Sequence, residues 1–240
     1  MDLLLILIVG LVAGVISGII GTGSSIMLLP ILAYAYGPKA AVPIMAVAAV
    51  MANASRILVW WREVDLRAFA VYALTGAPAA VLGAHTMLIL SPRAVDAAIG
   101  IFLLAMVPTR RWLSSRLIRL QLYQLALAGG AVGFLTGIVV STGPISVPVF
   151  MGYGLVKGAF IGTEAAASLA IYLAKVATFH DAGALPSVDL SRGLSVGASL
   201  MLGAFIAKPF VLRLAPETFR FVMDGLMVVA GTCLLWNAAN

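Results

Sequence analysis

The sequence predicts an all-α polytopic membrane protein made of two inverted repeats, each a broken helical hairpin followed by three transmembrane helices. Three observations lead to this fold class. Of the 240 residues, 62% are hydrophobic and only 10% are charged, and the mean hydropathy is +1.11, values that a soluble domain with a polar exterior does not reach. Glycine-rich breaks interrupt the apolar runs at matching places in the two halves. Most Lys and Arg residues lie in short loops between apolar runs, as in multi-pass membrane proteins.

The first break lies near the start of the chain. An apolar run from Leu3 to Ile20 ends in a stretch rich in glycine and hydroxyl groups, and a short apolar piece of 11 residues follows from Ile26 to Tyr36. At 1.5 Å per residue this piece spans only about 16 Å, about half of the hydrocarbon core of a bilayer, so it does not cross alone. The break consists of Gly21, Thr22, Gly23, Ser24 and Ser25.

The second half of the chain repeats this pattern. Gly14 and Gly18 correspond to Gly133 and Gly137 at one offset of 119 residues, and a second break and a short piece from Ile145 to Tyr153 follow. Interrupted helices at corresponding places in two halves are typical of a transporter's binding site. The four glycines before the breaks are expected to let helices pack closely. The second break consists of Ser141, Thr142, Gly143 and Pro144.

Three further apolar segments complete each predicted repeat. In the first half they are Ala41 to Trp61, Ala68 to Leu90 and Pro92 to Val107, the last behind the predicted N-cap Ser91. In the second half, which opens with Gln121 to Val140, they are Gly158 to Phe179, Leu190 to Leu214 and Pro216 to Trp236. We therefore predict a first repeat at residues 1–109, a basic cytoplasmic linker at 110–120 and a second repeat at 121–240.

The distribution of basic residues favours inverted copies. If each broken segment and its short piece made one crossing, the loops on the two sides would hold seven and six Lys and Arg residues. If each pair is a hairpin that returns to its own side, the numbers become ten and three, and the richer side is expected to be cytoplasmic. The ten are Arg62, Arg67, Arg110, Arg111, Arg116, Arg119, Lys157, Lys208, Arg213 and Arg220. This topology predicts that both termini are periplasmic.

Two basic residues belong to no loop in this count. Arg56 and Lys175 are also related by the offset of 119 residues, and each lies in the segment that follows the break of its own half. A charge inside a span costs about 2.5–3.5 kcal/mol on insertion scales, so it is seldom present without a use. The alternative is that each side chain lies near a helix end and reaches the headgroups by snorkelling. We favour a role for both cations in binding an anion.

Both breaks offer what an anion needs besides charge. Glycine lets the backbone approach a ligand closely, and a half-helix that begins at Ile26 or Ile145 presents unpaired N–H groups and the positive end of its dipole. The Ser and Thr hydroxyl groups add further donors. The alternative is that these small residues only serve helix packing. We favour ligand contact, and we predict every residue of the two breaks to be part of the substrate site.

Two polar residues in the same segments extend the predicted site. Asn53 lies one turn before Arg56 on the same helix face and is placed to orient it or the ligand, although a hydrogen bond between helices explains it equally well. Glu164 is a carboxylate inside an apolar segment, where it could bind a coupling proton. It could equally be an interfacial residue that pairs with a loop cation.

Several classes of protein are disfavoured by the sequence. A single cysteine, Cys233, excludes an internal disulfide and a cysteine metal site, and no cluster of His, Cys and Asp suggests a nucleophile or a metal centre. We therefore expect no enzyme, no metal and no cofactor. No phosphate-binding glycine loop is present for ATP. The formal charge of +6 comes from loop residues and does not indicate nucleic-acid binding.

The glycine and proline positions resemble those of the sulfite exporter TauE/SafE family. Gly14, Gly18, Gly21, Gly23 and Pro30 match the motif of its first half, and Gly133, Gly137, Gly143, Pro144 and Pro148 match the related motif of its second half. The pair Gly162-Thr163 resembles the family's Gly-Thr-Ser at the start of the next helix, which adds Thr163 to the predicted substrate site. Ser24, Ser25 and Glu164 depart from the family pattern, which usually has Gly, Gly and Ser there.

The resemblance implies export of a small sulfur-containing anion, such as sulfite, a sulfonate or sulfoacetate, across the bacterial inner membrane. Together with the breaks and the buried cations, it predicts a secondary transporter that binds its substrate between the two hairpins. An anion channel that uses the same donors is the alternative. The expected partners are the small anion and the lipid bilayer, and a homodimer stays open.

Overall fold

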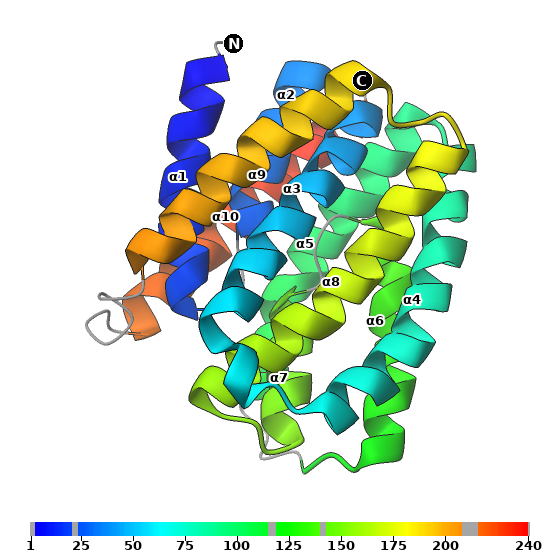
Figure 1. Ribbon diagram of the computed structural model, residues 1–240. Coiled ribbons are helices and arrows are strands. Elements are labelled where there is room, and N and C mark those ends of the chain that lie inside the picture. Colours follow the sequence, from blue (N-terminus) through cyan, green and yellow to red (C-terminus); the bar gives the residue numbers. More distant parts are fainter. Residues whose placement is uncertain (1–2, 21–23, 115–118, 140–142, 208–215, 240) are drawn as a thin grey trace.

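All secondary structure in the described part of the chain, residues 3–20, 24–114, 119–139, 143–207 and 216–239 of the computed structural model, is helical (Figure 1). The helices of the first half are α1 (Leu3–Ile20), α2 (Ser24–Tyr36), α3 (Pro38–Trp60), the 3-10 turn η1 (Trp61–Glu63), α4 (Leu66–Ile89) and α5 (Pro92–Ser114). Those of the second half are α6 (Leu122–Ile138), α7 (Gly143–Gly152), α8 (Lys157–Asp181), α9 (Ser187–Ala207) and α10 (Pro216–Ala239).

Four stretches within the described residues are long and apolar enough to cross a membrane. They are Pro38–Glu63, Leu66–Ile89, Pro92–Thr109 and Lys157–Asp181, with 26, 24, 18 and 25 residues. Shorter apolar helices, among them Leu4–Gly18 and Leu122–Ile138, lie beside them. The predicted fold class, an all-α polytopic membrane protein, is confirmed.

The two halves pack through equivalent pairs of helices. Helix α4 packs along α6 as α1 packs along α9, and α4 contacts α8 as α9 contacts α3, while α3 meets α8 and α5 meets α10. This set of contacts stays the same when each helix is replaced by its counterpart in the other half, α1 by α6, α3 by α8, α4 by α9 and α5 by α10. Both termini lie at the upper end of the bundle in Figure 1, with α2 at the upper end and α7 at the lower. These positions fit two hairpins that open toward opposite ends of the bundle. The division of the chain into two repeats by a linker at residues 110–120 stays a prediction.

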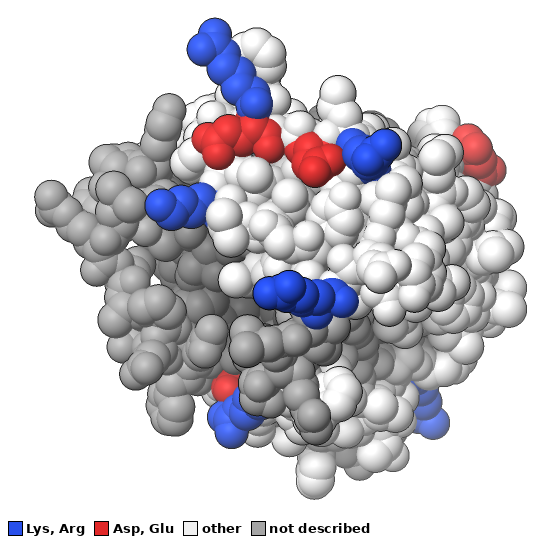
Figure 2. Space-filling view, turned by 90° about the horizontal axis from the view of Figure 1, so that it is seen from below, with Lys and Arg blue, Asp and Glu red and all other residues white. Residues whose placement is uncertain are grey.

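Several predicted loop cations are exposed near the lower end of the bundle, where α4, α6 and α8 begin (Figure 1). The exposed residues next to these helix starts are Arg62, Arg67, Arg119 and Lys157. Figure 2 views this end and shows the described Lys and Arg residues apart from one another, with Asp and Glu beside some of them. The described part of this surface therefore has no continuous basic patch of the kind that binds nucleic acid.

Glycines allow the closest helix contacts in both halves. A Cβ atom on Gly133 of α6 would lie 2.7 Å from the Gly76 carbonyl carbon of α4, and a Cβ on Gly14 of α1 would lie 2.8 Å from the Leu200 Cα of α9. Gly137 approaches the backbone of Gly83 in the same way. The predicted packing role is therefore confirmed for Gly14, Gly133 and Gly137.

Replacing Gly133 with alanine is expected to destabilise the protein. The added methyl group has no space against the α4 backbone, and overpacking of this kind costs about 1–3 kcal/mol. The melting temperature and monodisperse yield in detergent measure the effect. Gly130→Ala on the same helix is the matched control, because its Cβ would meet Thr75 at an ordinary 3.9 Å. Equal melting temperatures for the two variants would contradict this account.

Several predicted boundaries differ from those of the structure, and three of the differences bear on the breaks and on the linker. Ser24 and Ser25 form the first turn of α2, and Gly143 and Pro144 form the first turn of α7, so they start the half-helices that the sequence begins at Ile26 and Ile145. Helix α5 continues past the predicted end at Val107 to Ser114, so Arg110 and Arg111 are helical.

Contacts at the ends of α4 and α5 explain where these helices begin and connect the end of α5 to α10. Arg111 Nη2 lies 2.8 Å from Asp224 Oδ2, which ties the last turns of α5 to α10. At the start of α5, the Ser91 hydroxyl accepts from the Ala94 N–H at 3.2 Å, so the predicted N-cap is confirmed. Asp65 caps α4 by accepting from two backbone N–H groups. Local caps therefore explain the starts, and a tertiary ion pair connects the last turns of α5 to α10.

Candidate functional site

A small cavity lies where α3 and α8 meet the starts of α2 and α7. Its volume is about 30 Å³, so it suits a compact guest and not a large organic one. Both half-helices that follow the breaks reach it, as do the faces of α4 and α6 that turn toward α8. The lining residues are Ser24, Ser25, Ala49, Ala52, Asn53, Arg56, Tyr72, Val132, Thr136, Gly143, Glu164, Ser168, Ile171 and Tyr172.

Helices α3 and α8 present equivalent faces to this cavity. Three lining pairs between these two helices are related by the offset of 119 residues, namely Ala49 with Ser168, Ala52 with Ile171 and Asn53 with Tyr172. The positions within each helix are three and four residues apart, which places them on one face. The cavity is thus built from corresponding surfaces of the two halves.

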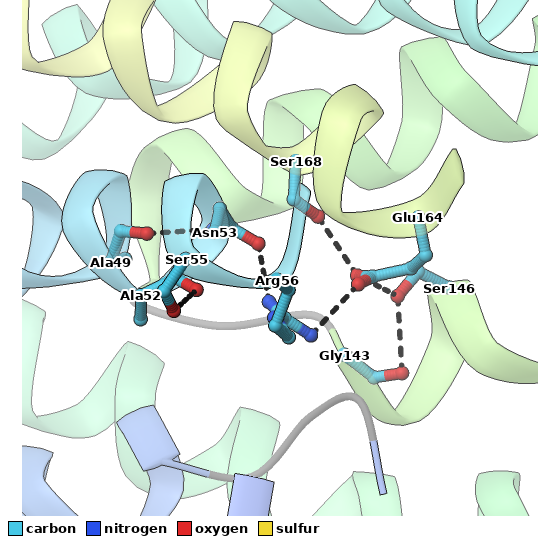
Figure 3. Close-up of polar contacts among 9 residues, drawn as sticks. All are labelled: Ala49, Ala52, Asn53, Ser55, Arg56, Gly143, Ser146, Glu164 and Ser168. Carbon is cyan, nitrogen blue, oxygen red and sulfur yellow. Dashed lines mark hydrogen bonds and ion pairs between the residues drawn. The ribbon is translucent and has the colours of Figure 1, made fainter. Parts of the chain in front are cut away.

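Arg56 is the described cation that lines the cavity, and it is held from two sides (Figure 3). Its Nη1 donates to Glu164 Oε2 at 3.2 Å, and its Nη2 donates to Asn53 Oδ1. The Asn53 amide is itself fixed, because its Nδ2 donates to the Ala49 carbonyl at 2.8 Å. The one-turn spacing of Asn53 and Arg56 predicts this contact, whereas nothing local in the sequence predicts Glu164 as the partner.

Glu164 is almost fully buried, with 2% of its surface exposed. Its second oxygen, Oε1, accepts from Ser168 at 2.8 Å and lies 3.1 Å from the Ser146 hydroxyl of α7 (Figure 3). The interpretation of Glu164 as the partner of a loop cation is therefore wrong, because its partner is the buried Arg56. As a result, the positive charge of the cavity is balanced by a carboxylate of the protein itself.

Two buried hydrogen-bond donors in the cavity have no partner among the described residues. They are Arg56 Nε and the Tyr72 hydroxyl, and both residues line the cavity. A buried donor that stays unpaired costs about 1–3 kcal/mol, so native structures rarely keep two in one place without a use. A guest rich in acceptor atoms would satisfy both. The cavity is therefore chemically suited to an oxyanion.

Lys175 is fully buried but does not line the cavity. Its Nζ donates to the carbonyls of Thr136 at 2.6 Å and Val139 at 2.7 Å, at the end of α6. A cation at the carboxyl end of a helix is stabilised by the unpaired carbonyls and by the helix dipole. Neither Lys175 nor Arg56 directs its charge to the surface, so the snorkelling interpretation is wrong for both.

The remaining predicted site residues are Thr163, Pro144 and five residues that lie outside the described part of the chain. The Thr163 hydroxyl accepts from the Asp65 N–H at 2.8 Å, at the start of α4, and Thr163 is not among the residues lining the cavity. Pro144 is in the first turn of α7. Gly21, Thr22, Gly23, Ser141 and Thr142 lie outside the described residues.

Nine cavity or network residues do not appear in the sequence-based site: Ala49, Ala52, Tyr72, Val132, Thr136, Ser146, Ser168, Ile171 and Tyr172. Ser168 and Tyr172 follow Glu164 by four and eight residues, so helical spacing alone could have placed them on its face. Tyr72 on α4 and Ser146 on α7 approach from other helices, and no spacing in the sequence connects them with Arg56. Within the described residues, no three His, Cys, Asp or Glu side chains come together as metal ligands would.

Comparison with known proteins places the whole bundle in one family. No curated protein and no solved structure matches the chain. The family model described as "Sulfite exporter TauE/SafE" matches residues 6–234, which include both hairpins and every residue that lines the cavity. The resemblance seen in the glycine and proline motifs is thereby confirmed. The chain belongs to the sulfite exporter TauE/SafE family and is a multi-pass membrane protein.

Proposed function

We propose that this protein is a secondary transporter that exports a small sulfur-containing oxyanion or organosulfonate, of the sulfite or sulfoacetate type, across the bacterial inner membrane. The observation that carries the proposal is the cavity between α3 and α8, in which Arg56 Nε and the Tyr72 hydroxyl are buried donors without a described partner. The family supports a transporter of this kind.

The donor set suits a compact anion with several oxygen atoms. A guanidinium group presents planar, fork-like N–H donors that match carboxylate, phosphate and similar oxyanions. Ser24 and Ser25, in the first turn of α2, also line the cavity, and the first turn of a helix offers backbone N–H groups and a favourable dipole. We propose that the anion binds to Arg56 and Tyr72, with the starts of α2 and α7 on either side.

The equivalent faces of α3 and α8 support alternating access. In transporters built from inverted repeats, the site lies at the repeat interface and one part of the bundle moves against the other. The exposed Arg62, Arg67, Arg119 and Lys157 favour a cytoplasmic position for the end with the linker, which puts both termini in the periplasm. A channel would use the same donors but would not saturate.

Transport by the purified protein in proteoliposomes tests the proposal. Uptake of sulfite, sulfate, thiosulfate and sulfoacetate is measured over a range of concentrations, with protein-free liposomes as the control. Saturable uptake with preference for one of the sulfur-containing anions supports a transporter. Flux that rises in proportion to concentration supports the channel, and no flux above protein-free liposomes rejects anion transport.

Replacing Tyr72 with phenylalanine is expected to weaken anion binding about tenfold or more, because a hydrogen bond to a charged group contributes about 1.5–3 kcal/mol. The melting temperature of the anion-free protein should stay unchanged, since the hydroxyl group has no described partner to lose. Binding is measured by anion-dependent thermal stabilisation. The control is Tyr123→Phe, which removes an exposed hydroxyl on α6. Equal affinities for both variants would contradict the role of Tyr72.

A further inference from the structure

We infer that Glu164 is a proton-binding site that loads together with the anion, so that one proton accompanies each anion through the protein. When the anion takes over the Arg56 guanidinium, Glu164 loses its partner and takes a proton from the side on which the anion entered. When the anion leaves, Glu164 releases this proton to the other side and pairs with Arg56 again. The inference rests on the proposed function, and it means that net export requires an outward anion gradient larger than the inward proton gradient.

The charge balance of the cavity carries this inference. Arg56 and Glu164 form a buried pair with no net charge, with exposed side-chain fractions of 10% and 3%. An anion that enters without a proton would place two negative groups on one buried cation. A buried charge that loses its partner is costly, and a carboxyl group avoids this cost when it binds a proton. A proton on Glu164 restores the original balance.

The described helices around Glu164 offer no other group to balance a second negative charge. Helices α6 and α7, which contact α8, contain no Asp, Glu, Lys, Arg or His. The groups that face Glu164 are Arg56 of α3 and, across the same cavity, the neutral Tyr72 of α4. Lys175 of α8 donates to α6 carbonyls instead. Tyr172 of α8 also lines the cavity and is buried. The remaining Lys, Arg, His, Asp and Glu side chains of α3, η1, α4 and α8 are exposed: Lys39, Arg62, Glu63, Arg67, His85, Lys157, His180 and Asp181.

The two serines beside Glu164 can serve both protonation states. Ser146 and Ser168 donate to the ionised carboxylate at Oε1, and a hydroxyl group can rotate to accept from a protonated carboxyl. Ser146 Oγ also lies 3.2 Å from the Gly143 carbonyl in the first turn of α7, so it has a second acceptor when Glu164 is neutral. Both serines can therefore hydrogen-bond to Glu164 in either protonation state. Protonation changes the contact between Ser146 of α7 and Glu164 of α8.

The corresponding position of the first half limits the stoichiometry to one proton. By the offset of 119 residues, Met45 is the residue that corresponds to Glu164 in the first half, and it is fully buried and apolar. The net charge moved in each transport cycle is therefore the charge of the anion plus the one positive charge of the proton. Transport of a monoanion is expected to be electroneutral and insensitive to membrane potential, whereas a dianion should carry one negative charge.

The test uses full-length protein in proteoliposomes with methanesulfonate and thiosulfate, whose charges stay constant between about pH 5.5 and about pH 8, so that any pH dependence comes from the protein. In this range the apparent KM of wild type is expected to rise up to tenfold per pH unit. An inward pH gradient should drive accumulation, and a trapped pH dye should report proton entry with the anion.

Glu164→Gln, which fixes the neutral form, should bind with a KM independent of pH and show no gradient-driven accumulation. Asp181→Asn, an exposed change on the same helix, should behave as wild type.

The possible failures are distinguishable. If wild type takes up neither anion nor any anion of the sulfite panel, the proposed function fails and the coupling fails with it. If wild type transports with a constant KM and no proton entry, the coupling alone is overturned, and this result needs no variant that might fold poorly. Gradient-driven accumulation by a folded Glu164→Gln protein also overturns it.

Discussion

Replacing Arg56 with methionine is expected to abolish saturable anion binding and to lower stability at the same time. Arg56 is the cation that lines the described cavity, so its loss removes the charge and the unpaired Nε donor from the site. The change also leaves Glu164 buried without its cation. Removing one partner of a buried pair destabilises proteins by about 3–5 kcal/mol. Uptake in proteoliposomes and the melting temperature in detergent measure the two effects.

A double variant separates the two effects. In Arg56→Met with Glu164→Gln the unpaired carboxylate is gone, so the melting temperature should return toward that of wild type while anion binding stays lost. Arg56→Lys keeps the charge, but a lysine ammonium cannot form the planar fork of a guanidinium, so weak binding with a raised KM is expected. Wild-type affinity in the double variant would show that the anion does not bind at Arg56.

The order of elements and half of the site were predictable from the sequence because both depend on local patterns. Helical spacing places Asn53 beside Arg56, and the structure has this contact. The offset between the halves leads to Arg56 and Lys175 as a related pair of buried cations, and both are buried. Glycine spacing indicates close helix packing, which Gly133 shows against α4. Helical periodicity is visible within one segment and duplication is visible between the two halves, so neither requires knowledge of how distant helices pack.

The partners of these residues were not predictable because they depend on how distant helices meet. Glu164 lies 108 residues from Arg56, and Tyr72 reaches the cavity from a third helix. The related cations also differ in use: Arg56 enters the cavity, while Lys175 turns to the end of α6. Duplication predicts equivalent positions, but the side chains around them have diverged, as Met45 opposite Glu164 illustrates. Charge pairing therefore differs between the halves, although their helices make equivalent contacts.

Replacing Lys175 with methionine is expected to separate stability and turnover from binding. The change removes the donor of two hydrogen bonds to the Thr136 and Val139 carbonyls, and bonds to a charged group contribute about 1.5–3 kcal/mol each. The end of α6 that these bonds hold leads into the second break, so a loosened end should slow the conformational cycle. Lys175 does not line the cavity, so the affinity for the anion should change by less than it does in Tyr72→Phe.

The melting temperature, anion-dependent thermal stabilisation and the maximal uptake rate measured on one preparation distinguish these effects. The expected pattern is a lower melting temperature and a lower maximal rate, with binding retained. Lys157→Met, an exposed change at the start of the same helix, is the matched control and should leave all three unchanged. The opposite pattern, with binding lost at an unchanged melting temperature, would mean that Lys175 leaves the α6 carbonyls to contact the anion itself. The two related cations would then both bind substrate, and the α6 contact would belong to the resting state alone.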